Sequence, residues 1–156
     1  MPKNQKQEII YTIMMVCVMV YAMVCYNIAI DNGGMQNWIF LAAFSELPIM
    51  GVIGFLLDTF IAGPIAKKHA FRIFQPKNDK MIFVILAISM LSVWMMCPMM
   101  SLAAAILFNG GIQKELISVW AELTVRNFPM ALLWQLFAAG PLVRAVFGKL
   151  FSEKCG

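Results

Sequence analysis

The sequence has little charge and a single histidine. Charged residues make up 13% of the 156 residues, whereas hydrophobic residues make up 62% and the mean hydropathy is +0.79. Soluble domains carry about 25% charged residues, so this composition excludes an ordinary soluble domain. His69 lies in a basic stretch without a second histidine, which excludes a histidine-based metal site or a nucleophile–base pair.

The four cysteines have no paired spacing, and no catalytic motif is present. Cys17, Cys25 and Cys97 fall inside long apolar stretches, and Cys155 lies in the C-terminal tail. This pattern does not indicate a disulfide framework or a zinc site. The sequence also has no serine–histidine–aspartate arrangement, phosphate-binding loop or zinc-protease motif. We therefore expect no cofactor, no metal and no enzymatic activity.

Four long apolar segments are present instead. Residues 9–30 hold no charge over 22 positions and residues 81–108 none over 28, whereas about 20 residues suffice to cross a bilayer. Residues 38–62 and 116–139 are also long enough, although both contain ionisable side chains. Because the backbone must satisfy its own hydrogen bonds in lipid, we predict an all-α membrane protein with four transmembrane helices.

The chain is an internal repeat. Residues 32–36 read Asn-Gly-Gly-Met-Gln and residues 109–113 read Asn-Gly-Gly-Ile-Gln, an offset of 77, and Gly63-Pro64 returns as Gly140-Pro141 at the same offset. The predicted units are residues 1–76 and 77–156, each a helical hairpin. Since each unit has two spans, the copies insert in the same direction and form a parallel repeat about an axis along the membrane normal. We expect Gly-Pro to stop or kink each second helix.

The basic residues predict the orientation. Ten of the twelve Lys and Arg residues lie in the two tails and in the connector at 65–80. The positive-inside rule then places both termini and this connector in the cytoplasm, in a multi-pass protein of the bacterial cytoplasmic membrane. The segments after each Gly-Pro read as short basic amphipathic extensions in the headgroup layer that attract anionic lipid headgroups. The lipid bilayer is the expected partner, and nothing indicates nucleic acid.

Several motifs carry a family resemblance. They occupy residues 21–28, 46–50, 96–101, 127–131 and 140–144, together with Gln135. With these motifs the chain resembles a bacterial family of small duplicated integral membrane proteins, found among Firmicutes and classed as a domain of unknown function. The resemblance covers nearly the whole chain. It implies a fold and a membrane location, and it brings no established activity or ligand.

Candidate functional residues are the ionisable groups inside the spans. Glu122 and Arg126 are four apart and lie on one helix face. Glu46 enters its span at a similar depth, so a cluster of Glu46, Arg126 and Glu122 is expected in the outer half of the bundle. Such a cluster is either a polar clamp that fixes helix register or a site for coupling protons or substrate. Three acids, Asp58 included, oppose one arginine, so we expect at least one acid to be protonated or interfacial.

Further polar residues lie in the second helix of each repeat. Asp58 corresponds to the neutral Gln135, which favours an interfacial Asp58 neutralised by Lys67 or its neighbour. Asn127 precedes Pro129 by two residues and either repairs that kink or lines a permeation path. Fourteen methionines are present, some at helical spacing, and read as flexible apolar filler more readily than as copper ligands.

We therefore expect a small transporter or permeation unit. Its site candidates are Glu46, Asp58, Glu122, Arg126, Asn127 and Gln135. Four helices enclose little room, so we expect a homodimer to complete the path. The alternative is a scaffold or regulatory subunit that does not transport, in which the same polar residues hold the helices together.

Overall fold

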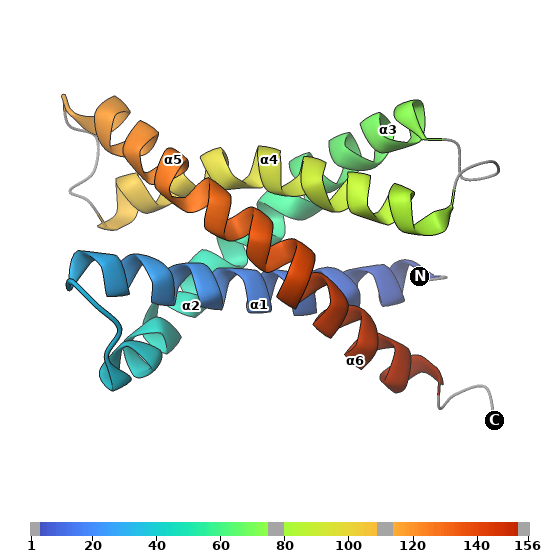
Figure 1. The fold of residues 1–156 in the computed structure, drawn as a ribbon, viewed down its shortest axis with the longest axis horizontal. Coiled ribbons are helices and arrows are strands. Elements are labelled where there is room, and N and C mark those ends of the chain that lie inside the picture. The colour runs from blue at the N-terminus through green and yellow to red at the C-terminus, as the bar shows by residue number, and fades with distance from the viewer. Residues whose placement is uncertain (1–3, 75–79, 109–113, 153–156) are drawn as a thin grey trace.

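The described part of the chain forms eight helical segments (Figure 1). The computed structural model describes residues 4–74, 80–108 and 114–152. The first repeat holds α1 (Gln5–Asp31), α2 (Asn37–Leu57), the π-helical η1 (Asp58–Ala62) and α3 (Gly63–Ile73). The second holds α4 (Met81–Phe108), α5 (Leu116–Trp134), the π-helical η2 (Gln135–Ala139) and α6 (Gly140–Ser152). Four continuous stretches are long and apolar enough to cross a membrane: Gln5–Asp31, Asn37–Ile73, Ile82–Phe108 and Leu116–Phe151. The prediction of a four-helix membrane protein made of two tandem hairpins is confirmed.

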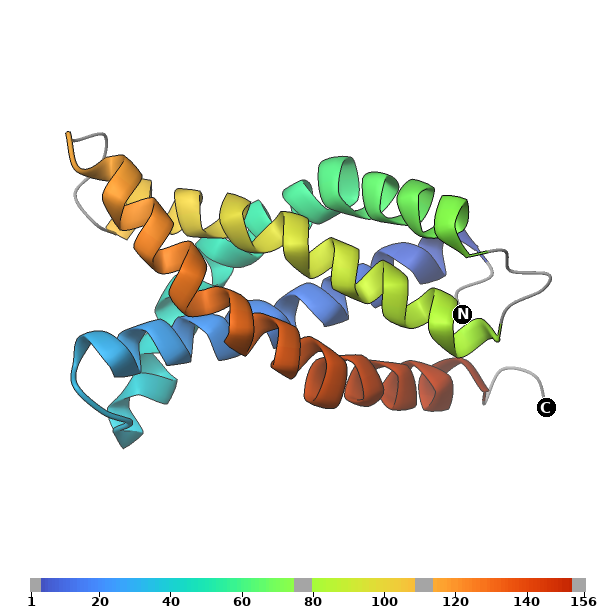
Figure 2. The same cartoon turned by 45° about the horizontal axis from the view of Figure 1, so that its top comes forward.

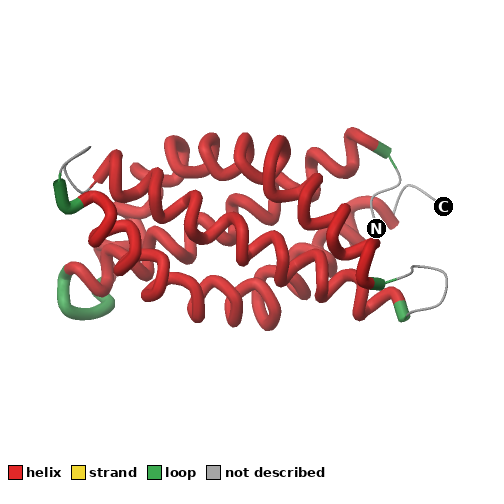
Figure 3. The backbone as a smooth tube through the Cα atoms, turned by 90° about the horizontal axis from the view of Figure 1, so that it is seen from above, coloured by secondary structure: helices red, strands yellow, loops and turns green. Residues whose placement is uncertain are grey.

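The first hairpin turns at its glycine pair, as the sequence predicts. Gly33 has a φ of 74°, in the left-handed region that favours glycine. The Gly33 N–H donates to the carbonyl of Ile30 and the Gly34 N–H to that of Ala29, which satisfies carbonyls at the end of α1. The corresponding turn of the second repeat, residues 109–113, lies outside the described residues. Figure 3 shows the turns gathered at the two ends of an elongated bundle.

The two repeats are interlocked. Within each repeat the two long helices pack as a hairpin, α1 on α2 and α4 on α5. The arms that follow cross over, so that α3 packs on α4 and α6 packs on α1. Tyr11 of α1 meets Phe147 of α6 edge to face, with 5.4 Å between ring centroids. The first helix of each repeat therefore completes its packing against the other repeat.

The second helix of each repeat does not stop at Gly-Pro, and its axis bends there (Figure 2). The Gly63 N–H donates to the carbonyl of Asp58, five residues back, and the Gly140 N–H donates to Gln135 in the same way. Each Gly-Pro therefore sits directly after a π-helical turn, whose widened backbone accommodates a proline that lacks a donor. A Cβ at Gly63 or Gly140 would lie 2.7 or 2.6 Å from those carbonyl oxygens, so only glycine fits. The helix predicted to end at residue 62 continues to Ile73, and the one predicted to end at 139 continues to Ser152.

The interior is small and the outer surface is apolar. Gly54 lets α2 approach closely, because a Cβ there would lie 3.2–3.3 Å from side chains of α1 and α4. Large apolar side chains such as Leu41, Ile117 and Phe137 are 74–78% exposed. A water-soluble protein would hide such a surface, whereas lipid solvates it.

Candidate functional site

A long cleft runs between the two repeats. It measures about 1030 Å³ and is lined from Gln5 at one end of α1 to Asn27 near the other. The 22 steps from Gln5 to Asn27 along this helix rise about 33 Å at 1.5 Å per residue. The cleft therefore extends over a length similar to the hydrocarbon thickness of a bilayer, about 30 Å.

The cleft is lined by equivalent positions of the two repeats. Its walls come mainly from α1 and α4, and lining residues of α1 have lining counterparts 77 positions later in α4. These pairs include Thr12 and Ser89, Val16 and Val93, Val20 and Cys97, Met19 and Met96, and Met23 and Met100. The cleft thus lies on the axis that relates the repeats, where carriers built from repeats place their binding sites.

Methionines dominate the middle of the cleft. Met15, Met19 and Met23 of α1 face it together with Met96 and Met100 of α4. Long unbranched thioethers adapt to irregular apolar partners, so this wall can follow the shape of a bound molecule. No group of three or more His, Cys, Asp or Glu side chains suitable for a metal ion occurs in the described ranges.

Charged residues lie at the end of the cleft that holds the start of α1. Asp58, the first residue of η1, and Gln135, the first residue of η2, both line it. Lys67 and Glu8 also line it and form an ion pair with each other. Arg144 is the remaining charged residue of the lining, and its Nε is buried without a hydrogen-bond partner among the described residues.

The opposite end of the cleft carries amides. Asn127 of α5 is 4% exposed and lines the cleft, and its Oδ1 has no hydrogen-bond partner in the part of the chain that the structure describes. Asn27 of α1 lines the cleft at this end. A buried amide oxygen without a partner is costly, so a water molecule or ligand that donates to Asn127 Oδ1 would stabilise this end of the cleft.

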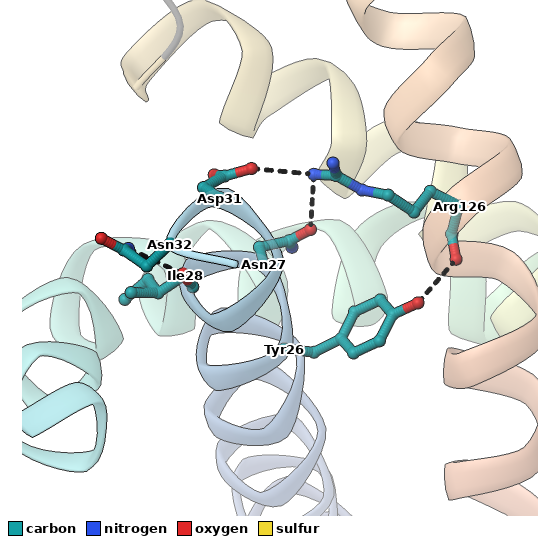
Figure 4. A network of polar contacts seen from close by, with 6 residues as sticks. All are labelled: Tyr26, Asn27, Ile28, Asp31, Asn32 and Arg126. Carbon is teal, nitrogen blue, oxygen red and sulfur yellow. Dashed lines mark hydrogen bonds and ion pairs between the residues drawn. The ribbon is translucent and has the colours of Figure 1, made fainter. Parts of the chain in front are cut away.

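Arg126 joins α5 to α1 beyond these amides (Figure 4). Its Nη2 donates to Asn27 Oδ1 at 3.4 Å and lies 3.4 Å from Asp31 Oδ1. The Tyr26 hydroxyl donates to the backbone carbonyl of Arg126 at 3.5 Å. Because Asn27 belongs both to this network and to the cleft lining, the network adjoins this end of the cleft.

The structure divides the six predicted site residues into two groups. Asp58, Asn127 and Gln135 line the cleft, whereas Glu46, Glu122 and Arg126 are not part of its lining. Arg126 pairs with Asp31 in place of the expected Glu46 and Glu122, because α5 packs on α1 and because Glu122 points outward and is exposed.

The surroundings of Asp58 also differ from the prediction, because Lys67, expected to neutralise it, is paired with Glu8. Within the described chain, no ion pair or hydrogen bond engages the Asp58 carboxylate.

Three residues at the cleft and its network are not among the predicted site residues. Asp31 and Glu8 lie just outside the two ends of the predicted first span, and Arg144 belongs to the basic C-terminal tail. The four-residue spacing of Asn27 and Asp31 puts both on one face of α1, and this was the available signal. Their partner on α5 depends on how the repeats dock, which no local pattern encodes.

Comparisons with known proteins agree with this architecture. The family model described as "Domain of unknown function (DUF2798)" matches residues 4–74 and again residues 80–151. The chain belongs to this family. It is also 40% identical over 157 residues to the "Uncharacterized protein YybC" of Bacillus subtilis (strain 168), covering 99% of this chain and 97% of that protein. No solved structure matches the chain. The two DUF2798 matches cover the two hairpins with their arms, and the cleft lies between them.

Proposed function

We propose that this protein is a small transporter that moves an organic solute through the cleft between its repeats. The observation that carries the proposal is the cleft itself, formed within one chain on the repeat axis. Its volume of about 1030 Å³ corresponds to sites for drug-sized molecules, about 300–1000 Å³, and is far larger than a bare ion needs.

The two ends of the cleft support a carrier. At one end Glu8 and Lys67 are 46% and 45% exposed, so water reaches their ion pair. At the other end the Arg126 network joins α5 to α1. A cleft that is open at the Glu8–Lys67 end, with a small polar contact between helices beside its other end, fits a carrier with alternating access. By the positive-inside rule, the open end faces the cytoplasm in a bacterial cytoplasmic membrane, with both termini inside.

The remaining expectations complete the proposal. The basic connector at 65–80 contacts anionic headgroups of the inner leaflet. A homodimer is compatible with this mechanism, although a second copy is not required to form the cleft, since all of its lining comes from one chain.

The native cysteines provide the test. Cys97 lines the cleft, whereas Cys25 is buried elsewhere. One variant keeps only Cys97, with Cys17, Cys25 and Cys155 changed to serine, and a matched control keeps only Cys25. In oriented vesicles we expect a small membrane-impermeant thiol reagent to modify Cys97 from the cytoplasmic side at least about tenfold faster than Cys25. Equal rates, with both cysteines unreactive from either side, would favour the non-transporting scaffold.

A further inference from the structure

The repeats contribute unequal charges to the cleft. Asp58 of the first repeat corresponds to Gln135 of the second, and Glu8 corresponds to Ile85. Only the basic position is kept, as Lys67 and Arg144. Since Glu8 neutralises Lys67, the cleft retains one carboxylate, from the first repeat, and one guanidinium, from the second, without partners in the described structure.

Both charges are placed by the π-helical turns. Asp58 is the first residue of η1. Arg144 follows Gly140 by one helical turn, and its Nη2 lies 3.1 Å from where a Cβ of Gly140 would be. The absence of a side chain at Gly140 leaves room for the guanidinium to fold back toward η2. Each repeat thus holds its charge beside its own π-helical turn, and no ion pair joins Asp58 to Arg144 among the described residues.

Asp58 and Arg144 are both only partly exposed, and neither has a counter-charge among the described residues. Intramembrane ionisable groups pair with one another or mark a path for a substrate. Asp58 and Arg144 do not pair with each other, so a bound molecule that satisfies both must carry a cationic and an anionic group. The adjoining methionine wall adds an apolar surface.

We propose that the cleft binds an amphipathic zwitterion. Its cationic group lies at Asp58, its phosphate or carboxylate lies at Arg144, and its apolar part lies against Met19, Met23 and Met96. This inference rests on the proposed transport function for its physiological meaning, and it is tested by binding alone. Such a molecule is either a free solute or the headgroup region of a zwitterionic lipid.

Three probes with the same six-carbon chain separate the contributions. Hexylphosphocholine carries both charges, hexyltrimethylammonium only the positive one and hexyl phosphate only the negative one. Binding is measured by calorimetry on the full chain in nanodiscs of phosphatidylglycerol, with empty nanodiscs subtracted. We expect hexylphosphocholine to bind at least about tenfold more tightly than either single-charge probe.

Two conservative variants assign the charges. Asp58→Asn is expected to lower the affinity for hexylphosphocholine and for hexyltrimethylammonium by about tenfold. The affinity for hexyl phosphate should stay the same or rise. Arg144→Gln is expected to lower the affinity for hexylphosphocholine and for hexyl phosphate by about tenfold, while the affinity for hexyltrimethylammonium should stay the same or rise. Glu122→Gln, on the exposed face of α5, is the matched control and should change no affinity. Circular dichroism and size-exclusion profiles that match the unmodified chain show that each variant is folded.

The source of the ligand is resolved by adding phosphatidylethanolamine to the nanodiscs. Competition with hexylphosphocholine supports a lipid ligand, and unchanged affinity supports a free solute. The proposal is overturned if all three probes bind equally, or if Asp58→Asn and Arg144→Gln leave their affinities unchanged. If the probes bind as expected but Cys97 is inaccessible from both sides, the proposed transport function is overturned and the proposed zwitterion site stands.

Discussion

Replacing the glycine after each π-helical turn tests how the bends are built. In Gly63→Ala the new Cβ would lie 2.7 Å from the Asp58 carbonyl oxygen, and in Gly140→Ala 2.6 Å from that of Gln135. Ordinary C···O contacts are about 3.3–3.6 Å, so the backbone must shift by roughly 0.6–1 Å. Crowding of this kind costs about 1–3 kcal/mol, whereas alanine in a helix gains about 0.5–1 kcal/mol over glycine.

The chain offers matched controls in the same two continuous helical stretches, Asn37–Ile73 and Leu116–Phe151. A Cβ at Gly51 or Gly148 meets nothing within 4 Å. Gly51→Ala and Gly148→Ala should therefore show only the helix gain. Each variant at Gly63 or Gly140 should be less stable than its control by about 1–3 kcal/mol, measured by reversible SDS titration in bicelles followed by circular dichroism. Equal stability in the two pairs would refute the requirement for glycine at the π-helical turns.

Two further variants test the contacts between helices. Arg126→Leu should cost no more than about 1 kcal/mol in the same SDS titration, because Asp31 is 60% exposed and water replaces the lost partner; a loss of several kcal/mol would show that the network is a buried clamp. Trp120→Phe removes the 2.8 Å hydrogen bond from Trp120 Nε1 to the carbonyl of Pro98 and should cost about 0.5–1.5 kcal/mol. Trp94→Phe is its control, since Trp94 is 66% exposed, and an equal effect of both variants would contradict a role for the hydrogen bond.

The sequence was sufficient for the architecture because its signals there are local. Uncharged runs that exceed the length needed to cross a bilayer predict membrane spans. The repeated Asn-Gly-Gly and Gly-Pro motifs identify two copies of one hairpin. The bend at each Gly-Pro was also predictable, since proline removes a donor. The continuation of the helix beyond Gly-Pro was not predictable. It depends on a π-type hydrogen bond to the carbonyl five residues back and on the packing of α3 and α6.

The site was predictable in part for a related reason. Asp58, Asn127 and Gln135 were found because polar residues inside a span are rare. Glu46 and Glu122 carry the same signal and lie outside the cleft, since only the docking of the repeats determines which face of a helix meets it. Arg144 could not be recognised as a site residue, because the positive-inside rule already accounts for a basic residue near a cytoplasmic tail.

The crossed arms also constrain how this protein is made. The last described helix, α6, packs on the first, α1, and α3 packs on α4, which follows it in the sequence. During insertion, the α1–α2 hairpin therefore remains in lipid without its contacts to α6 until the ribosome has synthesised α6. A chain cut after the first repeat would leave α1 without α6 and α3 without α4, and two separate halves would regain these contacts only by packing their arms on one another.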